Sequence, residues 1–172
     1  MNNIEKVALA ILDDFPIHKE MPASLSGKYH IGETSREHLE ITVNVCKHLC
    51  DEFNVHGEDR DMLIAATWLH DIGLYIINQK GDIDVLKGWE YYEATGYSRL
   101  VDVMQIHGTI GACILDKFDI PRKDEIQKLI RSHMSHWYSK EPQPNSLYEY
   151  IICTSDYVAS RGKDIFNYKE KK

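Results

Sequence analysis

The sequence contains no hydrophobic run that approaches the length of a membrane-spanning helix, which is roughly 18 residues. Its first residues, Met-Asn-Asn-Ile-Glu-Lys, carry an acid early and lack the apolar run of a signal peptide. We therefore expect a cytoplasmic protein that makes no contact with a membrane.

Cysteine is scarce, and no two cysteines form a Cys-x-x-Cys pair with the spacing of a metal ribbon. Two of the four cysteines, Cys46 and Cys50, lie four residues apart on a predicted helix and could face each other there. Free, buried thiols in a reducing compartment are the favoured interpretation of all four.

Positive charge is also in short supply, because 20 lysines and arginines stand against 27 acidic residues, for a net charge of −7. This balance argues against a broad nucleic-acid or anionic-membrane surface. A small anionic substrate remains compatible with it if local cations bind that substrate. Metal ions are the obvious candidates.

Strand patterns are absent, and so are a Walker-type phosphate loop and a serine-hydrolase elbow. Helical periodicity is present instead, and 172 residues suffice for one domain with a real core. We predict an all-α bundle with helices at residues 4–15, 36–53, 58–72, 107–118, 123–138 and 147–159. Ser35 is the expected N-cap of the second helix.

Three histidines occupy positions where the helical pattern calls for apolar residues: His38, His107 and His133. His38 shares a stripe with Ile41, Val45 and Leu49. Any one such histidine, taken alone, is more often a core residue with a hydrogen-bond partner. Three of them on three helices are harder to explain in that way.

A fourth histidine and an acid, His70-Asp71, end the helix 58–72, which is apolar nearly all round and is therefore predicted to be central. Buried imidazoles and carboxylates must be paired or bound to metal, so these residues point to a metal site in the bundle core. Asp156 is less clear, because it falls opposite the stripe of Leu147, Ile151 and Val158 and could be exposed.

The order of these residues resembles the signature of the HD-domain metal-dependent phosphohydrolases. The matching segments are Arg-Glu-His38-Leu-Glu, Trp-Leu-His70-Asp71-Ile-Gly and Ser-Asp156-Tyr-Val-Ala-Ser-Arg161, and the resemblance spans about Glu33 to Asp164. It implies an HD-domain helical bundle. We expect one domain over residues 1–172, with a core at about 33–164, an N-terminal helix and loop at 1–32, and a tail at 165–172.

Two further segments, His107-Gly-Thr-Ile-Gly111 and Ile130-Arg-Ser-His133, look like those that add histidines in the two-metal branch of the family. That branch includes diadenosine tetraphosphate hydrolases and HD-GYP phosphodiesterases. The sequence lacks a Gly-Tyr-Pro motif, and Leu74 stands where that branch often has lysine, which argues against a cyclic dinucleotide substrate.

The resemblance implies a ligand set for one or two divalent ions, with Fe, Mn, Co, Zn or Mg as candidates. One ion would bind His38, His70, Asp71 and Asp156, and a second would bind His107 and His133 with Asp71 as the bridge. His70 and Asp71 would also be the catalytic residues. The implied reaction is cleavage of a phosphoester or phosphoanhydride, above all in a nucleotide, by a metal-activated water.

Substrate-binding candidates are Arg161, His136 and Arg131, with Lys140 a weaker one. A solvated helix-end arginine is an equally good interpretation of Arg161. The aromatic residues at 89–97 could stack on a nucleobase, although core packing is favoured for them. Among the other histidines, His30 could reach the site, and the remaining ones are expected at the surface: His18, His48 and His56.

Two alternatives of a different class share these residues. Some HD proteins with the same ligands are mixed-valent di-iron oxygenases that act on small organic substrates. The chain could also be a non-catalytic HD domain that binds a nucleotide. A homodimer is compatible with each of these hypotheses.

Overall fold

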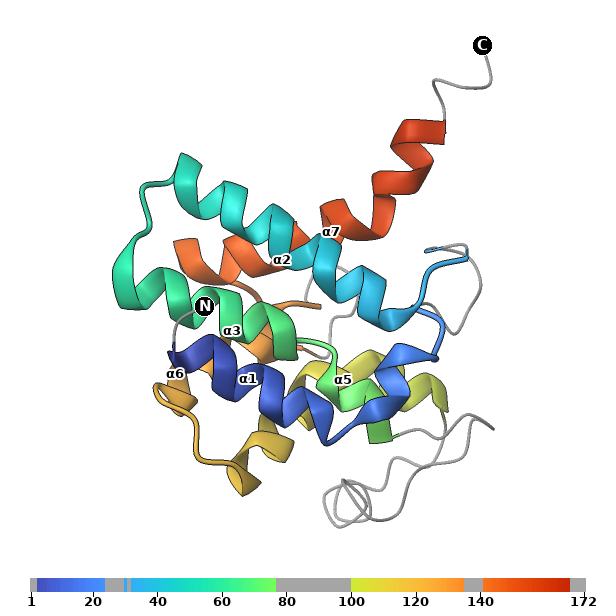
Figure 1. Ribbon diagram of the computed structural model, residues 1–172, viewed down its shortest axis with the longest axis horizontal. Helices are drawn as coiled ribbons and strands as arrows, with labels where there is room; N and C mark the ends of the chain where they lie inside the picture. The colour runs from blue at the N-terminus through green and yellow to red at the C-terminus, as the bar shows by residue number, and fades with distance from the viewer. Residues whose placement is uncertain (1–2, 24–29, 31, 77–99, 135–140, 168–172) are drawn as a thin grey trace.

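The computed structural model describes residues 3–23, 30, 32–76, 100–134 and 141–167, and its secondary structure is helical (Figure 1). The elements are α1 (Asn3–Asp13), η1 (Pro16–Lys19), α2 (Ser35–Glu52), α3 (Gly57–Leu69), η2 (Ile72–Ile76), α5 (Leu100–Ile114), η3 (Leu115–Lys117), α6 (Lys123–Ser132) and α7 (Leu147–Asn167). In this part of the chain, the only pairing of extended backbone is an isolated bridge between Pro22 and Thr34. The all-α prediction is confirmed.

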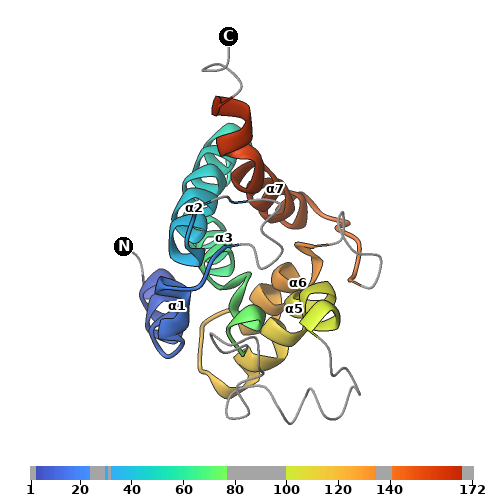
Figure 2. The ribbon, with the colours of Figure 1, turned by 90° about the vertical axis from the view of Figure 1, so that its right-hand side faces the viewer.

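Helix α3 lies at the centre of the bundle, as its apolar sequence predicted. Every residue from Met62 to Leu69 is buried, and the helix contacts α1, α2, α6 and α7 (Figure 2). The Trp68 indole N–H donates a hydrogen bond to Glu5 Oε1 at 3.1 Å, which fastens α1 to α3. Each large apolar side chain buried here contributes about 1.5–3 kcal/mol of transfer free energy. None of the described helices combines the length and hydropathy that crossing a bilayer would take.

Helix α2 begins with a capping box one residue earlier than predicted. Thr34 Oγ1 accepts the Glu37 N–H at 3.2 Å, and the Glu37 carboxylate accepts the Thr34 N–H at 2.8 Å. Ser35, the predicted N-cap, is instead the first helical residue, and its hydroxyl lies 2.6 Å from the Tyr75 hydroxyl. The glutamate three residues after Thr34 decides between the two candidates.

The buried face of α2 is also rotated from the predicted stripe. Ile41, Val45 and Leu49 are only partly buried, and the residues facing the core are Leu39, Thr42, Val43, Cys46 and Cys50. The helix packs against both α3 and α7, so its buried face is set between two neighbours. His38 remains buried because it borders this wider face.

The buried face of helix α7 was predicted only in part, because Ile151 of the predicted stripe is buried but Thr154 is exposed. Leu147 and Val158 are 45% and 40% exposed, whereas Ile152, Asp156 and Ala159 are buried. The helix also continues to Asn167, past the expected end at 159 and into the expected tail. The turn of the helix therefore carries Asp156 into the core, where the pattern alone allowed an exposed residue.

The position of His18 and the end of helix α3 also differ from expectation. His18 in η1 was expected at the surface but is fully buried, and its Nδ1 lies 2.7 Å from the Phe15 carbonyl oxygen. His48 and His56 are exposed, as predicted. Helix α3 ends at Leu69 rather than at residue 72, so His70 and Asp71 occupy the turn before η2.

Glycine allows three segments to meet around the middle of α5. This helix starts at Leu100, earlier than the predicted His107, and is kinked at Ile106, where φ is −131° and ψ is 17°. A Cβ on Gly73 would lie 2.0 Å from the His107 carbonyl oxygen, and one on Gly108 would lie 2.6 Å from the Ile130 carbonyl oxygen. The backbones of η2 and α6 therefore approach α5 at distances that no larger residue permits.

We expect Gly73→Ala to destabilise the protein by about 3 kcal/mol, at the upper end of the usual cost of overpacking, because the obstructing atoms belong to backbone. Urea denaturation measures the free energy of unfolding. Gly57→Asn is the control: Gly57 has φ +61°, no heavy atom lies within 4 Å of its Cβ position, and asparagine tolerates that φ. Equal stability of Gly73→Ala and wild type would contradict the close approach.

Candidate metal centre

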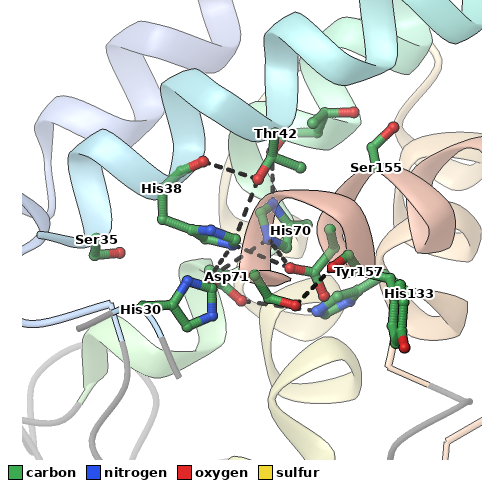
Figure 3. A network of polar contacts seen from close by, with 12 residues as sticks. His30, Ser35, His38, Thr42, His70, Asp71, His133, Ser155 and Tyr157 are labelled. Carbon is green, nitrogen blue, oxygen red and sulfur yellow. Dashed lines mark hydrogen bonds and ion pairs between the residues drawn. The ribbon is translucent and has the colours of Figure 1, made fainter. Parts of the chain in front are cut away.

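The structure brings all six predicted ligands into one buried cluster, and most of them lie near a helix end or at a kink, whereas Asp156 lies in the middle of α7. His38 comes from α2, His70 and Asp71 from the turn after α3, His107 from the kink of α5, His133 from the end of α6, and Asp156 from α7. All six are less than 8% exposed. Figure 3 shows His38, His70, Asp71 and His133 converging.

One half of the cluster is formed by His38, His70 and Asp156. The Nε2 of His38 lies 3.0 Å from Asp156 Oδ1, and the Nε2 of His70 lies 3.7 Å from the same oxygen. One potential ligand atom from each of the three residues lies within 4.8 Å of the other two. This spacing can hold one metal ion.

The other half is formed by His107 and His133. Asp71 Oδ1 lies 3.1 Å from His107 Nε2 and 3.7 Å from His133 Nε2, and the two Nε2 atoms are 3.0 Å apart. The ligand atoms of His70, Asp71 and His133 also lie within 4.8 Å of one another.

Asp71 faces both halves, because its two carboxylate oxygens point to different histidines. Oδ1 faces His107 and His133, whereas Oδ2 lies 3.4 Å from His70 Nε2 and 3.8 Å from His38 Nε2. A carboxylate in this position can bridge two cations.

Backbone carbonyls fix two of the imidazole rings. His70 Nδ1 lies 2.7 Å from the Thr67 carbonyl oxygen, and His133 Nδ1 lies 2.6 Å from that of Ile130. Both carbonyls belong to the last turn of a helix, and that of Ile130 also accepts the His133 N–H at 3.5 Å. Because a carbonyl only accepts, each Nδ1 carries the hydrogen, and each Nε2 directs its lone pair into the cluster.

The residues fit a divalent metal ion. The buried Nε2 of His70 has no hydrogen-bond partner in the described part of the chain, yet it faces the carboxylate oxygens of Asp71 and Asp156. A lone pair opposite two carboxylates requires a cation between them, which is either a proton or a metal ion. Mixed imidazole and carboxylate donors are the ligands that Fe²⁺, Mn²⁺, Co²⁺ and Zn²⁺ accept.

The pKa values of Asp156 and His70 are shifted by the opposite charges in the cluster. Burial by itself would raise the pKa of Asp156, but contact with His38 and the charge of His70 hold it well below its ordinary value. Burial would lower the pKa of His70, but the charges of Asp71 and Asp156 raise it to about 9. Both carboxylates therefore stay ionised, and in the protein alone a proton on His70 takes the place of a metal ion.

Glu141 is a supporting residue that the sequence pattern missed. Its buried carboxylate accepts the Thr109 N–H at 3.1 Å and the Thr109 hydroxyl at 2.6 Å. The kink at Ile106 restarts α5, so Glu141 serves the new helical turn as an N-cap side chain would. Glu141 lies 32 residues from Thr109, and no local signal reveals this contact.

The structure describes two of the three predicted substrate-binding residues, Arg161 and Arg131. Arg161 is partly buried, and its guanidinium carbon lies 5.7 Å from the centroid of the Tyr157 ring. Arg131 is also partly buried, near the end of α6. His136, Lys140 and the aromatic residues at 89–97 lie outside the described residues. His30 reaches the cluster, with its ring centroid 4.4 Å from that of His38.

If an ion binds beside His107, we expect Glu141→Ala to weaken its binding by about 10-fold, the lower end of the cost of losing a partner behind a ligand, because Glu141 holds Thr109 and not the ligand itself. Glu141→Gln keeps an acceptor for Thr109 and should lose less. Calorimetric titration with Mn²⁺ resolves the two binding steps. The control is Glu58→Ala, an exposed position. Equal weakening of both steps would contradict a specific role beside His107.

The comparisons with known proteins place the chain in a family. A search of curated proteins found no match, and neither did a search of solved structures. The family profile described as HD domain matches residues 36–161, most of the chain, and this range includes the six clustered residues. HD domains are usually metal-dependent hydrolases. The chain therefore belongs to the HD domain family.

Proposed function

We propose that this protein is a metal-dependent phosphohydrolase that cleaves a phosphoester or phosphoanhydride bond of a nucleotide. The observation that carries the proposal is the position of Asp71, whose two oxygens face two separate groups of histidines. Phosphoryl transfer uses such paired sites because the attacking and leaving oxygens both need stabilisation.

The residues divide between two ions as their distances suggest. His38, His70, Asp71 and Asp156 would hold one ion, and His107 and His133 would hold another that shares Asp71. When bound, such ions supply Lewis acidity, which lowers the pKa of water to ~7 and polarises a phosphoryl group. His70 and Asp71 keep the centre rigid, because a carbonyl fixes the imidazole and both halves share the carboxylate.

Arg161 is the residue we assign to a phosphate oxygen. It follows Asp156 by five residues on α7, and the contact with the Tyr157 ring orients its guanidinium. A guanidinium can hold phosphate in a bidentate manner, which a lysine cannot. In a chain of net charge −7, local cations of this kind must attract an anionic substrate.

We expect Asp71→Asn to lower kcat for the best nucleotide substrate by more than about 100-fold, beyond the effect of losing an outer-shell partner. The amide loses the charge that both halves share. The screen uses nucleoside mono-, di- and triphosphates, dinucleoside polyphosphates and a generic phosphodiester with Mn²⁺, Co²⁺ or Fe²⁺. The measurements are phosphate release and the count of bound ions.

Asp119→Asn is the matched control, because Asp119 is exposed and far along the chain from the ligands. Metal-loaded protein that turns over no phosphorylated compound would contradict hydrolysis. Oxygen uptake by an iron-loaded sample would then favour a di-iron oxygenase, which the same donors suit. Tight nucleotide binding without product would favour a binding domain.

We expect Arg161→Ala to raise KM about 10-fold or more and Arg161→Lys to restore only part of the loss, because lysine keeps the charge but not the bidentate geometry. Steady-state kinetics with the best substrate measures both constants. Lys117→Ala, at an exposed position, should behave as wild type. An unchanged KM in Arg161→Ala would assign this arginine to the solvated helix surface.

A further inference from the structure

A second group of potential ligands adjoins the centre but begins outside the family match. His30 and Glu33 precede residue 36, where the match starts, and together with His38 they place three ligand atoms within 4.8 Å of one another. Ring contacts run from His30 to His38, then to His70 and His133. Figure 3 shows His30 and His133 at opposite ends of this row.

The group contains three buried polar atoms that have no hydrogen-bond partner among the described residues: Nδ1 of His30, Oε1 of Glu33 and Nδ1 of His38. The Glu33 side chain is only 1% exposed, and the contact between His30 Nδ1 and Glu33 Oε2 is 3.5 Å. Each buried unpaired group costs about 1–3 kcal/mol. All three atoms belong to residues that together could hold one ion, which indicates that a shared partner belongs among these residues.

The backbone holds His30 and Glu33 together in a tight turn. The Glu33 N–H donates to the His30 carbonyl oxygen at 3.1 Å, and His30 itself has a left-handed φ of +57°. Hydrogen bonds from Ala23 N–H to the Glu33 carbonyl oxygen and from Ser35 N–H to that of Met21 anchor the turn. The side chains are thus placed before any ligand arrives.

The chemistry of the three groups is that of a cation site. The His30 imidazole lies against that of His38, with the ring centroids 4.4 Å apart, and its buried Nδ1 can offer a lone pair to a cation. His38 directs Nε2 to Asp156, 3.0 Å away, which leaves Nδ1 as its free donor atom. Two imidazole nitrogens and one carboxylate suit a divalent transition-metal ion.

We propose that His30, Glu33 and the Nδ1 of His38 form an additional binding site for a divalent transition-metal ion, beside the centre built on Asp71. The ion displaces the proton of His38 Nδ1 to solvent, and the imidazole then joins the two sites. Only one carboxylate serves this ion, and neighbouring cations repel it, so it binds more weakly than the ions of the main centre.

The test counts Co²⁺ ions bound to the full chain after equilibration, in wild type, His30→Asn and Glu33→Gln. Asparagine tolerates the left-handed φ of residue 30, and glutamine keeps the shape of Glu33, so both variants should fold. Circular dichroism checks this. Each variant is expected to bind one ion fewer than wild type. The matched controls, His48→Asn and Glu52→Gln, lie at exposed positions of α2 and should bind as many ions as wild type.

A crystal of the Co²⁺-loaded protein locates the ions by anomalous scattering, with a peak expected between His30, Glu33 and His38. Equal ion counts in all proteins, with a water in place of the peak, would overturn the additional site and leave the main centre intact. Loss of every ion in Glu33→Gln would also overturn it, because the group would then only support the main centre. Wild type that binds no ion would overturn both proposals.

Discussion

The buried carboxylate of Asp71 is the charge around which the rest of the structure is arranged. An ionised carboxylate away from water is tolerated only when it is paired, and its partners here are imidazoles from α2, the α3 end, α5 and α6. Four segments distant in sequence must therefore meet at one point. The glycines at positions 73 and 108 permit that meeting, because any side chain there would collide with a neighbouring backbone.

Most of the cluster forms where helices end or bend, and this position fixes two of its rings. The last turns of α3 and α6 each present a carbonyl oxygen to an imidazole, and these contacts fix the directions of the His70 and His133 rings. At the kink of α5, the Thr109 N–H donates a hydrogen bond to the Glu141 carboxylate. Two backbone carbonyls thus orient ligands directly, and one additional buried carboxylate, that of Glu141, supports the helical turn that follows His107.

The sequence predicted the all-α fold and the convergence of six residues, and it did so best where one helix face was unambiguous. His107 and His133 lie on stripes that are buried as predicted. The buried faces of α2 and α7 were predicted only in part, because periodicity does not reveal on which sides of a helix its neighbours lie. Asp156 was placed by family resemblance, not by its pattern. Glu141 depends on contact across 32 residues, which no local rule anticipates.

The need for cations beside the buried acids links the fold to its proposed chemistry. The histidines around Asp71 and Asp156 hold the pKa of both carboxyls well below the ordinary range, while burial lowers the pKa of His30 and of His133. Glu33 adds a third buried acid beside them. Cations are therefore needed to balance these acids in the interior. Bound cations would create a local positive field within a chain of net charge −7, and the phosphorylated substrate that we propose would need such a field to bind. The interior that requires cations is thus also the place where an acidic protein can hold an anion.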